Sequence, residues 1–167
     1  MKTKILLLAF ALCGAINVNA QHDHDHDHDH DHGDHGHGDH GHSHEQAKAG
    51  PNGGKVVEAT EPHFELFIQD DRKVRVTFLN DELKPMAHDG ATVSAIGGDR
   101  SKPARLSFEQ VAGAYVSTEP MPDGANVPLI LRVKPDQKSK TATARININL
   151  AQCPTCDFKE YACICGH

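Results

Sequence analysis

The sequence predicts an all-β fold, a single small antiparallel β-sandwich or barrel that spans residues 51–150. Short runs rich in Val, Ile, Phe and Thr recur through this region, and these residues are enriched in strands. Several runs alternate apolar with polar residues, as at Phe64, Leu66 and Ile68. This period of two is typical of strands that bury one face. Turn-forming Gly, Pro, Asp and Asn residues separate the runs, which favours hairpins over helical connections.

Seven or eight strands are expected, because a few of the runs are short. The runs lie at 55–60, 63–69, 73–80, 91–97, 104–110, 114–119, 127–134 and 141–150. This number of short strands within about one hundred residues fits one domain of ordinary size. No segment predicts a helix. Because the chain has no Trp and few aromatic residues, the core must consist mainly of Val, Ile, Leu and Phe.

Residues 1–20 resemble a secretory signal peptide. Lys2 and Lys4 precede an apolar run, and small residues end at Ala20, where cleavage is expected. The apolar run is short for a membrane span, and the residue before Cys13 is too large for a lipoprotein site. We therefore expect a periplasmic or secreted mature protein without stable membrane insertion. An uncleaved anchor is the alternative.

Residues 21–50 form a His/Asp-rich segment followed by a short hinge. Residues 22–44 contain eleven of the fourteen histidines, seven aspartates and no apolar residue. Such a segment cannot bury enough surface to offset the entropy of ordering it, so we expect it to be disordered. Imidazole is the commonest protein ligand for divalent transition metals, and ligands at nearly every position favour capture of several ions. The candidate ligands are His22, His24, His26, His28, His30, His32, His35, His37, His40, His42 and His44.

The metal remains open among zinc, nickel, cobalt and copper. Copper(II) is favoured by affinity, whereas availability can favour the others. Histidine binds metal only when it is neutral and titrates near pH 6.5, so capture should weaken in mild acid. The alternative is a solvated low-complexity segment that only keeps the protein in solution.

Charge is distributed unevenly along the chain. Residues 21–46 contain eight acidic residues and no basic ones, whereas residues 47–167 contain fifteen of each. A neutral body lacks the excess of basic residues that nucleic acid requires. We therefore expect metal ions, and no nucleic acid, as partners.

Two stretches of the expected β-domain resemble a known family. The first contains Pro-Asn-Gly-Gly at 51–54, then His63-Phe-Glu-Leu66, and ends in Lys-Pro at 84–85; the second is 114–150. They are similar to the small HGG…EL domain of periplasmic adaptor proteins from heavy-metal RND efflux systems (membrane fusion proteins) and of their free-standing relatives. The resemblance implies a heavy-metal efflux or uptake transporter as partner. Asn52 stands where the pattern has His, so a metal site there would be weakened or absent.

Two further histidines lie within the β-domain. His63 precedes an expected strand and can act with Glu65 as a ligand pair, since the two share a strand face. His88 lies beside Met86 and Asp89 in a turn-like stretch, and Met, His and Asp side chains together can hold copper(I) or copper(II). For both histidines the alternative is an ordinary hydrogen-bonding role.

The last segment, 151–167, is rich in cysteine. Its candidate ligands are Cys153, Cys156, Cys163, Cys165 and His167. Four thiolates, or three with one imidazole, are the ligand set of a tetrahedral zinc site, and soft thiolates also accept copper(I) or cadmium. Structural disulfides are the first alternative in an oxidising compartment, and a redox-active CxxC motif is the second.

Together these patterns favour a metal-binding protein that serves as a buffer or chaperone linked to heavy-metal efflux or homeostasis. One alternative is a structural or partner-binding β-sandwich stabilised by zinc or disulfides in its Cys-rich tail. A thiol-disulfide redox protein is another. The chain contains no HExxH helix, nucleophile elbow or phosphate loop, so an enzyme is not expected.

Overall fold

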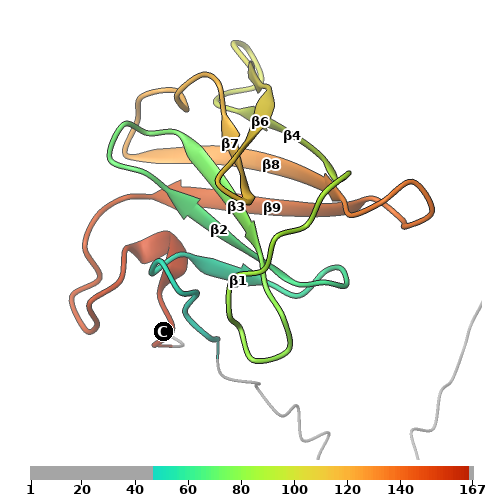
Figure 1. Ribbon diagram of the computed structural model, residues 1–167. Coiled ribbons are helices and arrows are strands. Elements are labelled where there is room, and N and C mark those ends of the chain that lie inside the picture. The colour runs from blue at the N-terminus through green and yellow to red at the C-terminus, as the bar shows by residue number, and fades with distance from the viewer. Residues whose placement is uncertain (1–46, 166–167) are drawn as a thin grey trace, which may run out of the picture. The chain divides into compact units, whose positions relative to one another are not determined.

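The computed structural model describes residues 47–165, which fold into two antiparallel sheets packed face to face (Figure 1). Strand order is β1-β2-β3-β7-β6 in the five-stranded sheet and β5-β4-β8-β9 in the four-stranded sheet. The strands are β1 (Lys55–Val57), β2 (Phe64–Ile68), β3 (Val74–Phe78), β4 (Thr92–Gly97), β5 (Ala104–Leu106), β6 (Phe108–Val111), β7 (Ala114–Ser117), β8 (Asn126–Lys134) and β9 (Ala142–Asn149). The predicted all-β sandwich is confirmed.

The signal-peptide prediction, the eleven histidines from His22 to His44, and His167 lie outside the described residues. Within residues 47–165, no helix has the length and apolar character needed to cross a membrane.

The expected strand at 104–110 is two strands that belong to different sheets. Leu106 is buried at the end of β5 in the four-stranded sheet, whereas Phe108 begins β6 and pairs with Ser117 of β7. The chain changes sheets at Ser107, whose carbonyl accepts a hydrogen bond from the Thr118 N–H at 2.9 Å. Strands that change sheets form the corners of sandwiches.

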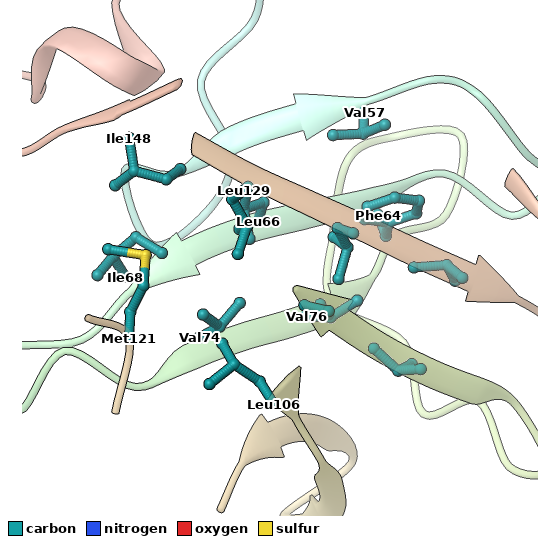
Figure 2. Packing of buried hydrophobic residues seen from close by; sticks show 14 of the residues in the cluster. Val57, Phe64, Leu66, Ile68, Val74, Val76, Leu106, Met121, Leu129 and Ile148 are labelled. Atoms are coloured by element: carbon teal, nitrogen blue, oxygen red, sulfur yellow. The ribbon is translucent and has the colours of Figure 1, made fainter. Parts of the chain in front are cut away.

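The core lies between the inner faces of the two sheets (Figure 2). In the five-stranded sheet, Leu66 of β2 pairs with Val76 of β3, and both side chains are fully buried. Leu129 of β8 and Ile148 of β9 approach them from the other sheet. Full burial of each such side chain is worth about 1.5–3 kcal/mol.

Glu65 is completely buried although it lies on the outer face of β2. The loop before β1 folds over this carboxylate and donates three hydrogen bonds to it: from Asn52 N at 2.9 Å, Asn52 Nδ2 at 2.6 Å and Gly54 N at 2.8 Å. A Cβ atom at Gly50 would lie 2.4 Å from the Glu65 carboxyl group, so the loop can approach only with glycine there. The chain that precedes β1 is thereby fixed against the five-stranded sheet.

Candidate metal centre

The chain after β9 turns back and is anchored to the sandwich by a short 3-10 helix, η1 (Glu160–Ala162). Within η1, Tyr161 and Ala162 are buried, and the helix lies against β1 and β9. The Tyr161 hydroxyl accepts a hydrogen bond from the Ile68 N–H of β2 at 3.0 Å. Because η1 is held in this way, the cysteines on either side of it have fixed positions.

One backbone hydrogen bond and two from the Gln152 side chain close a tight loop around the first cysteine pair. The Cys153 N–H donates to the Phe158 carbonyl at 3.0 Å. The Gln152 amide donates to the carbonyls of Cys156 and Phe158, both at 3.1 Å. The loop therefore presents the sulfurs of Cys153 and Cys156 on the side where the second pair, Cys163 and Cys165, arrives.

The four Sγ atoms lie within 4.8 Å of one another. The distance from Cys153 Sγ to Cys163 Sγ is 3.5 Å, and that from Cys156 Sγ to Cys163 Sγ is 3.9 Å. A tetrahedral site with zinc–sulfur bonds of about 2.3 Å has sulfur–sulfur distances of about 3.8 Å. Among residues 47–165, none of the cysteines forms a disulfide bond. The cluster can therefore hold a metal ion such as zinc.

Exposure rises from one end of the cluster to the other. Cys153 is buried, Cys156 and Cys163 are half-buried, and Cys165 is exposed. The closed end of the site is the buried Cys153, and its open end is the sulfur of Cys165. Ligand exchange with another molecule is easiest at that sulfur, because solvent already reaches it.

Two hydrogen-bond donors lie among the sulfurs. The Thr155 hydroxyl lies 3.1 Å from Cys165 Sγ and 3.3 Å from Cys153 Sγ, and its single proton can be donated to one of these sulfurs at a time. The Cys165 N–H donates to Cys163 Sγ at 3.3 Å. Hydrogen bonds to sulfur favour the charged thiolate and orient it toward a metal.

These contacts give Cys153 and Cys163 different pKa values. Hydrogen bonds from the Thr155 side chain and backbone lower the pKa of Cys153 to about 6. The Cys165 N–H also lowers the pKa of Cys163, but burial and the neighbouring thiols outweigh it and raise that pKa to about 12. At neutral pH the metal-free cluster thus contains a ready thiolate at Cys153 and a thiol at Cys163. A metal ion must displace the proton of Cys163 to bind both sulfurs.

Substitution of Thr155 by valine is expected to raise the pKa of Cys153 from about 6 by at least about one unit, because its largest stabilising hydrogen bond is lost. A pH titration of the thiolate ultraviolet absorbance, on reduced metal-free protein, measures this. Thr143→Val, at an exposed position of β9, is the matched control and should leave the curve unchanged. An unchanged titration of Thr155→Val would contradict the assignment.

The same pKa values set the sign of the pH effect on the stability of the metal-free fold. The pKa of Cys153 is depressed from 9.0 to about 6, so the stability it contributes is present above about pH 9 and is lost as pH falls through 6. The pKa of Cys163 is raised from 9.0 to about 12, so its contribution is present below about pH 9 and is lost as pH rises toward 12.

Comparisons of the chain with protein families, with curated proteins and with solved structures find no match. The similarity to the efflux-adaptor domain thus rests on the sequence motifs alone.

The structure places His63 and His88 in hydrogen-bonded positions away from the cysteines. His63 Nδ1 lies 2.9 Å from the Thr60 carbonyl, while Glu65 is occupied by the loop before β1. His88 Nε2 lies 3.0 Å from the Pro135 carbonyl, and its ring packs on Phe78 at a centroid distance of 4.4 Å. Among the described residues, only the cysteine cluster joins three or more potential ligands.

Sequence reasoning missed three residues that build the centre: Gln152, Thr155 and Tyr161. Thr155 had a signal, since a hydroxyl between the two cysteines of a CxxC motif is close enough to hydrogen-bond to either sulfur. Tyr161 had a weaker one, because it is the only aromatic residue between the cysteine pairs apart from Phe158. Its partner Ile68 lies 93 residues earlier in the chain, and no local pattern predicts that contact.

Proposed function

We propose that this protein binds transition metals in the periplasm or outside the cell, as a buffer or chaperone without catalytic activity. The observation that carries the proposal is the convergence of four cysteine sulfurs within 4.8 Å. This donor set suits zinc, and it also suits copper(I). The eleven histidines of residues 22–44 supply additional, weaker sites for zinc, nickel, cobalt or copper(II).

Location and partner follow from the sequence. The signal-like residues 1–20 support export, and the similarity to efflux-adaptor domains supports a heavy-metal efflux or uptake transporter as the recipient or donor of the ion. Export has a consequence for the cysteines, because an oxidising compartment favours disulfides over thiols. Metal bound before oxidation protects the thiolates.

Native mass spectrometry of the reduced mature protein, titrated with zinc, tests the proposal. Two variants separate the sites: one with all four tail cysteines replaced by serine, and one with the eleven histidines of residues 22–44 replaced by asparagine. We expect the histidine variant to retain one ion under competition with a chelator. The cysteine variant should lose that ion and keep several weaker ones. Equal zinc uptake by the cysteine variant and the unchanged protein would refute the cysteine centre.

A second function is supported by the anchoring of η1 through Tyr161. In that case the metal only stabilises the attachment of the tail to a sandwich that has a structural or partner-binding role. Removal of the metal would then lower the unfolding temperature strongly, and loss of the histidines would change neither metal content nor stability. Uptake of several ions by the histidine-containing segment argues for the buffer instead.

The low pKa of Cys153 favours a third function, thiol-disulfide exchange. Against it, Cys153 opens a tight loop, whereas redox CxxC motifs open a helix. Reductant-dependent reduction of a disulfide substrate would support this function. A metal-blocked cluster without such turnover would exclude it.

A further inference from the structure

Basic side chains gather on the outer face of the four-stranded sheet. Its strands, β4, β5, β8 and β9, contain four basic residues and no acidic ones. Three of the four are exposed arginines, Arg105, Arg132 and Arg145. The strand neighbours Leu106 and Leu131 belong to the core, and successive side chains of a strand point to opposite faces. The arginines therefore point away from the core, on a face with an excess of positive charge.

Strand register places two arginines and two isoleucines in one row across this face. Arg105 of β5 pairs with Ile96 of β4. Ile96 in turn pairs with Ile130 of β8, which pairs with Arg145 of β9. Adjacent strands lie about 4.8 Å apart, so the Cα atoms of the two arginines are separated by roughly 14 Å. The row thus has a cation at each end and an apolar pair in the middle.

Two hollows on this face are both lined by the isoleucine pair. One hollow, of about 420 Å³, is also lined by Arg105 and Arg132. The other, of about 610 Å³, is also lined by Arg100 and Arg145, beside one acidic residue, Asp99. Within residues 47–165, no side-chain hydrogen bond or ion pair engages any of these four arginines. Their guanidinium groups are free to bind anionic groups of another molecule.

We propose that this face binds an extended acidic segment of a partner protein, in which two acidic residues flank an apolar one with one residue between each. In an extended chain, the first and fifth residues share a face and lie roughly 13 Å apart. This separation matches the row, so the two carboxylates meet Arg105 and Arg145. The central apolar side chain then lies on Ile96 and Ile130. Each guanidinium group can donate two parallel hydrogen bonds to a carboxylate.

The form of the face favours a polypeptide over an anionic membrane. Ile96 and Ile130 are half-buried at the floor of the hollows, whereas the arginines around them are exposed. A protruding apolar side chain is therefore needed to reach the isoleucines. Lipid headgroups and nucleic acid supply the negative charge but leave the isoleucine floor uncovered. Proteins that bind membranes through a surface instead bury an apolar face in the headgroup layer.

Nuclear magnetic resonance titration of the isotope-labelled, reduced mature protein tests the proposal, because the method detects weak binding and locates it. The probe is the capped peptide Asp-Thr-Leu-Thr-Asp, and its control is Asp-Asp-Leu-Thr-Thr, which has the same composition and charge. We expect the probe to shift backbone amide signals of β4, β5, β8 and β9 and to bind at least about 5-fold more tightly than the control. This ratio corresponds to one well-placed exposed ion pair of about 1 kcal/mol. Binding should weaken as salt is raised from about 50 to about 500 mM.

Charge-matched variants locate the binding. Arg105→Gln and Arg145→Gln should each weaken binding of the probe by about 2- to 5-fold, and the double variant by at least about 4-fold. Lys84→Gln also removes one positive charge, but Lys84 lies in the loop after β3 and pairs with Glu82. This variant should leave the affinity unchanged. All the substituted side chains are exposed, and the amide spectrum of each variant verifies its fold.

Equal affinity for the two peptides would overturn the proposal, because charge alone would then explain the binding. Equal weakening by Lys84→Gln and Arg145→Gln would overturn it for the same reason. Vesicles of phosphatidylglycerol that bind the protein through the same arginines, without binding of the probe, would replace the partner segment with a membrane. The inference uses no residue of the cysteine centre, so its failure leaves zinc uptake and the proposed function untouched.

Discussion

Replacing Cys153 by serine is expected to weaken zinc and cobalt binding at the cysteine centre by at least roughly 100-fold. Cys153 is the most buried of the four cysteines, and its sulfur lies 3.5 Å from that of Cys163. A serine hydroxyl at this position stays protonated and cannot replace a thiolate as a ligand. Loss of a partner outside the ligand shell already weakens metal binding about 10–100-fold, and loss of a ligand exceeds that. Competition with a chromophoric chelator at neutral pH measures the change.

Two control variants accompany this prediction. Cys165→Ser should weaken binding less, because the Cys165 sulfur is exposed and water can take its place. Ser94→Ala, at an exposed position of β4, should leave the affinity unchanged. Cys153→Ser protein that binds zinc as tightly as the Ser94→Ala protein would show that the ion is held elsewhere.

The fold class was predictable because its signal is local. Alternation at Phe64, Leu66 and Ile68 is visible in the sequence, and these side chains do face the core. The break at Ser107 was not predictable, because alternation continues from Leu106 into Phe108 while the chain changes sheets. A period of two shows which side chains share a face, but it does not show which sheet that face belongs to.

The site was predictable in part. Spacing within the two cysteine pairs identifies four ligands without fixing how the pairs meet. Their meeting depends on the anchor from Tyr161 to Ile68, a contact between distant parts of the sequence. Strand alternation alone left open whether His63 and Glu65 form a ligand pair or whether His63 has an ordinary hydrogen-bonding role. The structure pairs Glu65 with the preceding loop, where Asn52 donates two hydrogen bonds to its carboxylate.

Replacing Glu65 by alanine is expected to lower the free energy of unfolding by about 3–5 kcal/mol. The carboxylate accepts three hydrogen bonds from Asn52 and Gly54, and a hydrogen bond to a charged group contributes about 1.5–3 kcal/mol. These contributions are not additive, and relaxation of the loop recovers part of the loss. Glu65→Gln should cost less, because one amide oxygen can still accept both backbone N–H groups. Urea unfolding of the reduced metal-free proteins measures both changes.

Glu109→Ala is the matched control, since Glu109 is exposed on β6, and it should change the stability by less than about 0.5 kcal/mol. A loss below about 1 kcal/mol for Glu65→Ala would mean that the loop holds its position without the carboxylate. The consequence extends to the metal centre, because this loop fixes the chain that leads back to Ala47 and Lys48 beside Cys163.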